Sequence, residues 1–291
     1  MKIPLLIVSH NRPRMLKDMV TSIEQYTDPA TYQLIVCDNH STQPEAIAYL
    51  SELEQRHRVL HNPQNLVFEG LNVGLRVVQD LGSPYFLISD PDLKLGPATP
   101  SDWIVRLSEI LDKTAYPKAA LALDASYAAD TPWKELIKRE TERSGLWKHK
   151  VNFDFIEDDC YEAPVDTTMA LYRRDTFNYW NRGLRFDREH GIEGGGWINL
   201  TQYNPKYKGI ALRVAGRFTC EHLGWWFDPK YLPDFAFYYE HSAGRKVAST
   251  LQKNIVETML RSVPEEDRHL LTADAETYPE FNKLLGEINN G

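Results

Sequence analysis

The first ninety residues alternate between strand-like and helix-like patterns, and this alternation narrows the possible folds more than any other feature. The strand-like runs are 3–8, 33–37, 59–60 and 85–89. The first is continuously apolar, as expected of a strand buried on both faces. Segments with apolar residues at helical spacing lie between these runs. The alternation therefore predicts a mostly parallel sheet covered by helices, with right-handed crossovers.

The helices in this part have recognisable starts. Pro13 suits the first position of a helix. Ser41 is the expected N-cap of the second helix, with Ile47, Leu50 and Leu53 predicted as its inward stripe. A third helix is expected around 71–78.

The second half is less regular. A helix is expected over 102–111, with strands over 119–123, 167–173 and 210–218. Residues 124–164 have no clear period and predict a long excursion over the sheet. Helical spacing returns from 242 to 264 and again around 281–288.

Polar residues follow three of the predicted strands, at 9–12, 38–41 and 90–92. In open parallel sheets, ligands bind beyond the carboxyl ends of the strands. The three clusters are therefore predicted to form one site.

Asp90 and Asp92 stand two residues apart after an apolar strand. Two carboxylates placed in this way can face one hard cation, which in turn can hold a diphosphate. The alternative is a strand-end turn in which an aspartate caps the next segment. The Asp-x-Asp pattern alone does not decide between them.

Composition excludes some classes of protein. The chain has 291 residues, with 33 basic and 41 acidic side chains and a net charge of −8. This acid excess argues against broad nucleic-acid binding. Three widely spaced cysteines suit a reducing compartment, and no apolar run reaches the roughly 18 residues of a membrane span. A cytoplasmic location, without signal peptide or membrane span, is the expectation.

Together, these motifs resemble glycosyltransferase family 2, which has the GT-A fold. The stretches that carry the resemblance are 4–13 (PLLIVSHNRP), 34–42 (LIVCDNHST), 65–75 (NLVFEGLNVGL) and 85–92 (YFLISDPD). They occur in the family's order. The third has Val67 where the family has glycine, and the fourth falls where the family has its metal-binding Asp-x-Asp motif.

The resemblance implies an α/β, Rossmann-like GT-A fold with a mostly parallel central sheet flanked by helices and a C-terminal helical extension. The implied domains are 1–240 for the glycosyltransferase part and 241–291 for the extension. Within the first, 1–95 would bind the nucleotide and 96–240 the acceptor.

The resemblance also implies nucleotide-sugar contacts. The residues concerned are Ser9, Asn11, Arg12, Asp38, Asn65, Gly70, Asn72 and Asp90. Arg12 at a helix entrance can pair with phosphate, or form a surface salt bridge. Asp38 can accept hydrogen bonds from a base or ribose, or form an Asx turn. Gly74 allows close backbone approach or serves helix packing.

Downstream, 163–177 (APVDTTMALYRRDTF) resembles the family's acceptor-side strand, so Asp166 and Thr167 would face donor or acceptor, or would cap a turn. The stretch 186–197 (FDREHGIEGGGW) falls where the family's Glu-Asp motif supplies the catalytic base. Glu193 is present, but Gly194 replaces the second acid. Glu193 is the predicted base, ahead of Asp187 and Glu189.

The stretch 220–226 (CEHLGWW) follows a predicted strand. In many GT-A enzymes a late histidine is the third metal ligand, and His222 matches that place beside Asp90 and Asp92. Carboxylate and imidazole ligands fit Mn²⁺ at least as well as Mg²⁺. Trp225 can stack on the apolar face of a sugar, or belong to the core.

The predicted function is a metal-dependent inverting glycosyltransferase that uses a UDP- or GDP-type sugar donor and a hydroxyl acceptor such as a glycan or a lipid-linked group. A sugar nucleotidyltransferase is the first alternative, although the loop 9–12 lacks glycine. A non-catalytic nucleotide-sugar-binding protein is the second, supported by the Glu193-Gly194 pair. The amphipathic C-terminal segment fits peripheral membrane association as well as packing on its own domain.

Overall fold

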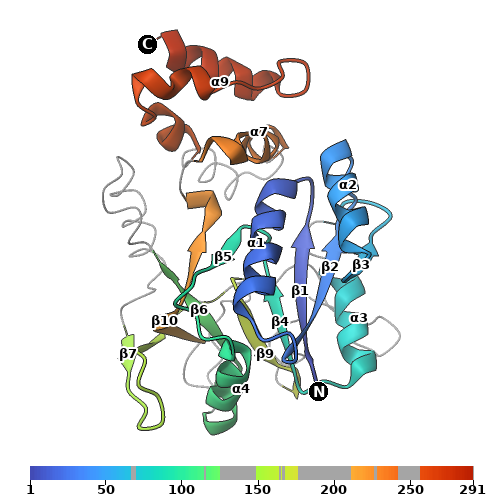
Figure 1. Cartoon of the computed structure of the whole chain (residues 1–291), viewed down its shortest axis with the longest axis vertical. Coiled ribbons are helices and arrows are strands. Elements are labelled where there is room, and N and C mark those ends of the chain that lie inside the picture. Colours follow the sequence, from blue (N-terminus) through green and yellow to red (C-terminus); the bar gives the residue numbers. More distant parts are fainter. Residues whose placement is uncertain are drawn as a thin grey trace.

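The computed structural model describes residues 1–66, 70–114, 116–124, 149–163, 165, 168–175, 211–225, 228–241 and 256–290. Figure 1 shows the elements along the chain.

The first part alternates strictly between strand and helix, as predicted. Its elements are β1 (Ile3–Ser9), α1 (Pro13–Tyr26), β2 (Tyr32–Asp38), α2 (Pro44–Leu53), β3 (Arg58–His61), α3 (Asn72–Leu81) and β4 (Tyr85–Ser89). Each crossover helix buries one face on the strands, which is why parallel pairing is possible here.

The second part adds shorter strands and the C-terminal helices. Its elements are β5 (Leu93–Leu95), α4 (Trp103–Lys113), β6 (Lys118–Asp124), β7 (His149–Val151), β8 (Cys160–Glu162), β9 (Ala170–Arg173), β10 (Leu212–His222), α7 (Leu232–His241) and α9 (Pro279–Asn290). Short 3₁₀ turns cover Leu223–Trp225, Pro229–Tyr231 and Glu265–Leu270. Residues 256–261 are also helical.

The described strands form one sheet in the order β3-β2-β1-β4-β9-β6-β10-β8-β7, with β5 paired to β10. The ladders β1–β2, β1–β4, β2–β3 and β6–β10 are parallel, whereas β9 runs antiparallel to both β4 and β6. Since β9 reverses direction between β4 and β6, all the main strands on either side of it point the same way. The carboxyl ends of β1, β2, β4 and β10 therefore meet at one edge.

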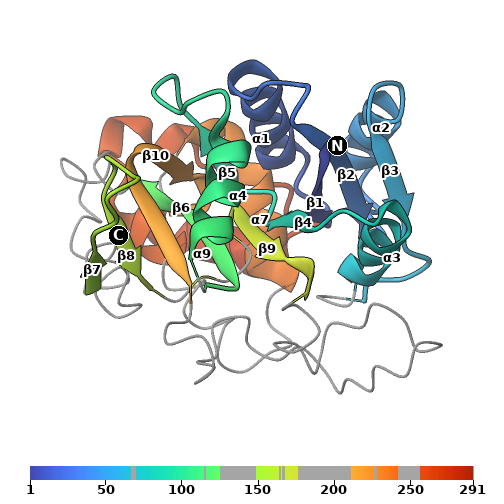
Figure 2. The ribbon, with the colours of Figure 1, turned by 90° about the horizontal axis from the view of Figure 1, so that it is seen from below.

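Helices cover both faces of this sheet. The side chains of α1, α2 and α4 share one core with Leu5, Leu34 and Leu87, whereas α3 packs on Leu6 and Ile35 of the opposite face. Figure 2 shows α1 and α3 on opposite sides of the row of strands. The predicted α/β, GT-A-type architecture of a largely parallel sheet between helices is confirmed.

The second helix differs from its prediction in two details. Its N-cap is Gln43, because the Ser41 hydroxyl instead accepts a hydrogen bond from the Asn11 backbone N–H. Ile47 is 48% exposed, so its predicted place in the inward stripe is wrong. The buried stripe is Ala46, Tyr49, Leu50 and Leu53. These positions follow the spacing i, i+3, i+4, i+7 more closely than the predicted set does.

The C-terminal helices form a core of their own at the end of the molecule toward which β1 and β2 point (Figure 1). This cluster includes Leu223, Phe235, Phe281 and, from α1, Met15. It joins α7 to the residues that follow. The division at 240/241 stays a prediction. Among the described residues, no helix is both long and apolar enough to cross a bilayer.

Candidate active site

The loop between β1 and α1, residues 9–12, lies at the carboxyl edge of the sheet. Hydrogen bonds of its own buried residues fix its position. Asn11 is 1% exposed and has a positive φ of 49°. Its side-chain oxygen accepts hydrogen bonds from the backbone N–H groups of Thr42 (2.7 Å) and Gln43 (2.9 Å), at the start of α2. Ser9 is also buried, and its carbonyl accepts from Asn39 N–H. Both residues therefore position the loop, and their predicted nucleotide contacts stay predictions.

Asp38 ends β2 and is 4% exposed. One carboxylate oxygen accepts a hydrogen bond from Ser41 N–H (3.0 Å), and the other lies 2.9 Å from His61 Nδ1. The hydrogen bond from Ser41 N–H forms an Asx turn, which is the alternative role given above for Asp38. Burial acts to lower the pKa of His61, but hydrogen bonds to Asp38 and Glu54 outweigh it and raise the pKa.

Asn65 and Gly70, from the stretch 65–75, lie beside Asn39 of the stretch 34–42. The Asn39 side chain donates to Asn65 Oδ1 (2.9 Å), and Leu66 N–H donates back to Asn39 Oδ1 (2.9 Å). A Cβ on Gly70 would come within 2.6 Å of that same Asn39 oxygen, so glycine makes room for Asn39. Asn72 Oδ1 is buried and has no hydrogen-bond partner among the described residues.

The centre of the site is an ion pair between Arg12 and Asp92. Arg12 Nη1 donates to Asp92 Oδ2 at 2.8 Å, and their side chains are 18% and 11% exposed. Asp92 Oδ1 is buried and has no hydrogen-bond partner among the described residues. Burial acts to raise the pKa of Asp92, but the charges of His222 and Arg12 outweigh it, so the pKa lies below its usual value. Asp92 is therefore a carboxylate at neutral pH.

His222 reaches the same carboxylate from the end of β10. His222 pairs with Leu93 across the β5–β10 ladder, and Leu223 N–H donates to the Asp92 carbonyl at 2.7 Å. A Cβ placed on Gly224 would lie 3.2 Å from His222 Nδ1 and 3.6 Å from Asp92 Oδ2. The imidazole and the carboxylate thus border one small space, which is open because residue 224 is glycine.

These residues fit a divalent metal in part. Among the described residues, no group of three His, Cys, Asp or Glu side chains is close enough to hold an ion by itself. However, Asp92 Oδ1 is buried without a hydrogen-bond partner among the described residues, and the other oxygen of that carboxylate, Oδ2, borders the space beside His222. Magnesium-type sites commonly use one or two carboxylates and take their remaining ligands from water and phosphate. The donor set therefore fits an ion that is completed by a diphosphate.

Asp90 follows β4 directly and is partly exposed. Its charge acts on both Arg12 and Tyr238, which places it in the same electrostatic cluster. Of the predicted metal ligands, Asp92 and His222 are brought together, and Asp90 stands near them.

Helix α7 supplies a wall of the site that sequence reasoning missed. The Arg12 guanidinium lies 5.3 Å from the centre of the Tyr238 ring, and His10 packs edge-on against Phe237 at 5.2 Å. Asp234, 1% exposed, accepts a hydrogen bond from Met15 N–H at 2.9 Å, in the first turn of α1. The one available signal was the density of aromatic residues in 235–239.

The predicted base and acceptor residues are not placed. Glu193, Asp166 and Thr167 lie outside the described residues, and so does the side chain of Trp225. Their roles stay predictions.

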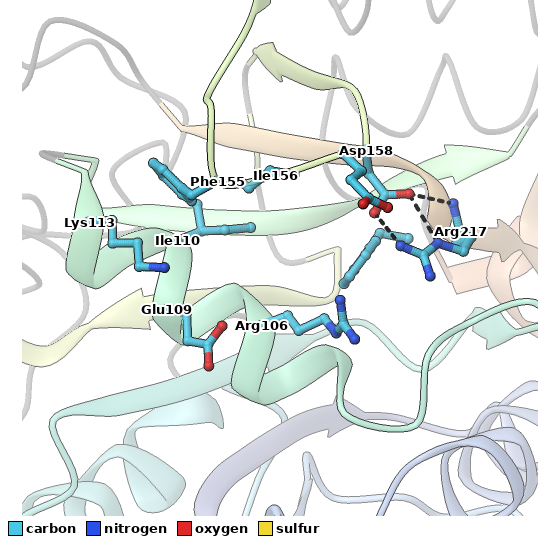
Figure 3. A pocket seen from close by; sticks show the side chains of 10 residues that line it. Arg106, Glu109, Ile110, Lys113, Phe155, Ile156, Asp158 and Arg217 are labelled. Atoms are coloured by element: carbon cyan, nitrogen blue, oxygen red, sulfur yellow. Dashed lines mark hydrogen bonds and ion pairs between the residues drawn. The ribbon is translucent and has the colours of Figure 1, made fainter.

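A separate cavity of about 340 Å³ lies between α4, the residues 155–158 and β10. Figure 3 shows Arg217 paired with Asp158 at its rim, with Arg106 and Lys113 on the α4 side. None of the predicted site residues lines this cavity.

Comparison with protein-family models matches residues 5–180 to Glycosyl transferase family 2. The match covers more than half of the chain, so this protein belongs to that family and is a glycosyltransferase. A comparison with curated protein sequences found no match.

Among solved structures, the chain is similar to TarS from S. aureus, at 10% identity, covering 99% of this chain and 80% of that one with a TM-score of 0.44. It is also similar to the mannosyltransferase PcManGT from Pyrobaculum calidifontis, solved in complex with GDP-Man and Mn2+. There the identity is 13%, the coverage 100% and 75%, and the TM-score 0.46.

Proposed function

We propose that this glycosyltransferase moves a sugar from a nucleoside-diphosphate sugar of UDP or GDP type to a hydroxyl acceptor, with a divalent metal and with inversion at the anomeric carbon. The observation that best supports this is the meeting of Asp92 and His222, 130 residues apart in the sequence, around the space beside Gly224. An Asp-x-Asp turn alone would not require an imidazole at that position.

In this proposal, Asp90, Asp92 and His222 hold Mn²⁺ or Mg²⁺. When bound, the ion neutralises charge on the diphosphate leaving group. The loop 9–12 and the start of α3 lie at the edge of the sheet where the nucleotide binds. Asn72 Oδ1, buried without a partner among the described residues, is available to accept a hydrogen bond from the donor.

The transfer step is a single displacement. The acceptor oxygen attacks the anomeric carbon, the bond from that carbon to the diphosphate oxygen breaks, and its electron pair leaves with the diphosphate. The acceptor proton goes to a carboxylate, for which we propose Glu193. Inversion follows because the acceptor enters on the face opposite to the leaving group.

The direct test measures sugar transfer or donor hydrolysis for the wild type and for Asp92→Ala, with Mn²⁺, with Mg²⁺ and after chelation. We expect wild-type turnover to disappear after chelation, and Asp92→Ala to lose at least 100-fold in kcat, roughly the value of a well-placed charge. Asp80→Ala, at an exposed position on α3, is the matched control. Undiminished, chelator-resistant transfer by Asp92→Ala would show that this carboxylate binds no catalytic metal.

A further inference from the structure

Arg12 pairs with one oxygen of the carboxylate that the proposed metal site requires, and the other oxygen has no hydrogen-bond partner among the described residues. Its Nη1 lies 2.8 Å from Asp92 Oδ2, which is also the oxygen nearest the space shared with His222. At this distance, the positive charge of Arg12 lies next to a side chain that the metal would use as a ligand.

The surroundings favour this position of Arg12. The Tyr238 ring lies 5.3 Å from the guanidinium carbon, and a cation gains from such a ring face. Asp90, Asp92 and Asp234 all act to hold Arg12 in its charged form, against burial. Because the carboxylates of Asp90 and Asp92 repel each other, an internal cation stabilises the site when no metal is bound.

A divalent ion at Asp92 and His222 would stand close to the guanidinium. Two cations on one carboxylate repel strongly when water is largely excluded. The repulsion is relieved when a diphosphate arrives, because arginine pairs with phosphate through two parallel hydrogen bonds. Arg12 then has a partner other than Asp92.

We propose that Arg12 is an internal counter-cation that blocks the Asp92 site to free metal and exchanges Asp92 for the donor diphosphate, so that metal and nucleotide bind together. This inference rests on the proposed function. Binding energies are reciprocal, so nucleotide raises metal affinity by the same factor as metal raises nucleotide affinity.

The test measures Mn²⁺ affinity from the paramagnetic resonance signal of free Mn²⁺, alone and with UDP or GDP. We expect Arg12→Gln to bind Mn²⁺ alone about tenfold more tightly than the wild type, and to lose most of the increase that nucleotide gives the wild type. Arg12→Lys keeps the charge, so it should bind Mn²⁺ alone as weakly as the wild type does, but it should gain less affinity from nucleotide because an ammonium cannot make the two parallel hydrogen bonds. Arg106→Gln, an exposed arginine paired with Asp102, is the control.

The outcomes separate the two claims. Equal Mn²⁺ affinity in the wild type and Arg12→Gln, or weaker binding by Arg12→Gln, would overturn the counter-cation role and leave Arg12 as a residue that orients Asp92. Absence of Mn²⁺ binding in all variants, with or without nucleotide, would overturn the metal-dependent function itself and this inference with it.

Discussion

Asn11 and Asp38, at the carboxyl edge of the sheet, use their side chains to position neighbouring segments of the chain. Their side chains hold the ends of β1, β2 and the start of α2 in register through contacts with Ser41, Thr42 and His61. The sequence predicted that these residues belong to the site, and they lie at the predicted edge. It did not predict their partners, because Asx turns and ligand contacts use the same residue types.

The Asp-x-Asp motif was predictable from its position after an apolar strand, and His222 from the resemblance to the family. The involvement of Tyr238 and Asp234 was not, because each depends on α7 packing against a loop more than 200 residues earlier in the chain. Long-range placement of this kind leaves no periodic trace in the sequence.

Asp234 gives a prediction about stability against pH. Burial raises the pKa of Asp234 to about 7, despite the Met15 hydrogen bond and the charges of Arg14 and Arg12. Since the folded pKa exceeds the unfolded value of 3.8, the stabilising contribution is complete below about pH 4 and is lost as the pH rises to about 7.

Asp234→Asn removes the charge and keeps an oxygen for the Met15 N–H. Its melting temperature should gain on the wild type by a few degrees as the pH rises from 4 to 7, and the gain should then stay constant. Asp267→Asn, at an exposed position, should show no such gain. A difference that is flat across this range would mean that Asp234 does not titrate with a raised pKa.

Glu193 gives a kinetic prediction at the same scale. If it removes the acceptor proton, Glu193→Gln should lower kcat by about 10²–10⁴-fold, the usual effect of a general base, and leave donor binding intact. Glu189→Gln, four residues earlier, tests the competing candidate for the base and should lose less activity. A larger loss in Glu189→Gln than in Glu193→Gln would move the base to Glu189.

At the level of elements, α3 shows why a glycine stands in a helix. A Cβ on Gly74 would lie 2.6 Å from Cys37 Sγ and 3.0 Å from Leu6 Cδ2, so glycine lets α3 approach the sheet closely. The packing role considered for this residue is thus the one that the structure supports.

Gly74→Ala should therefore destabilise the protein by about 1–3 kcal/mol, the usual cost of overpacking a core. Gly286→Ala in α9 is the matched control, because its Cβ would meet nothing within 4 Å. It should stabilise the protein by about 0.5–1 kcal/mol, since alanine is the better helix former. Urea unfolding measures both, and a stabilising Gly74→Ala would contradict the close packing of α3.

The strand–helix alternation of the first ninety residues made this part of the fold predictable from local patterns. The short strands β5, β7 and β8 were not predicted, since three residues are too few to show a period. Helix α7 was missed for another reason. Its buried residues Leu232, Asp234, Phe235, Ala236, Phe237 and Tyr239 do not follow one stripe.

For the whole molecule, the acidic charge matters most at the edge of the sheet where the proposed site lies. The net charge of −8 and the pair Asp90–Asp92 both oppose the binding of a diphosphate. Arg12 offsets part of that charge, and its partner Asp92 keeps one buried oxygen without a hydrogen bond among the described residues. Donor binding should therefore depend on a divalent cation.

The most direct measurement is the thermal shift of the wild-type protein with a panel of nucleoside diphosphates and nucleotide sugars, each with and without Mn²⁺. Ligands that bind only the folded state raise the melting temperature, so the panel reports donor binding directly. We predict that one nucleotide family stabilises the protein, and only when Mn²⁺ is present. Equal stabilisation by a nucleotide sugar with and without Mn²⁺ would contradict the metal-dependent site at Asp90, Asp92 and His222.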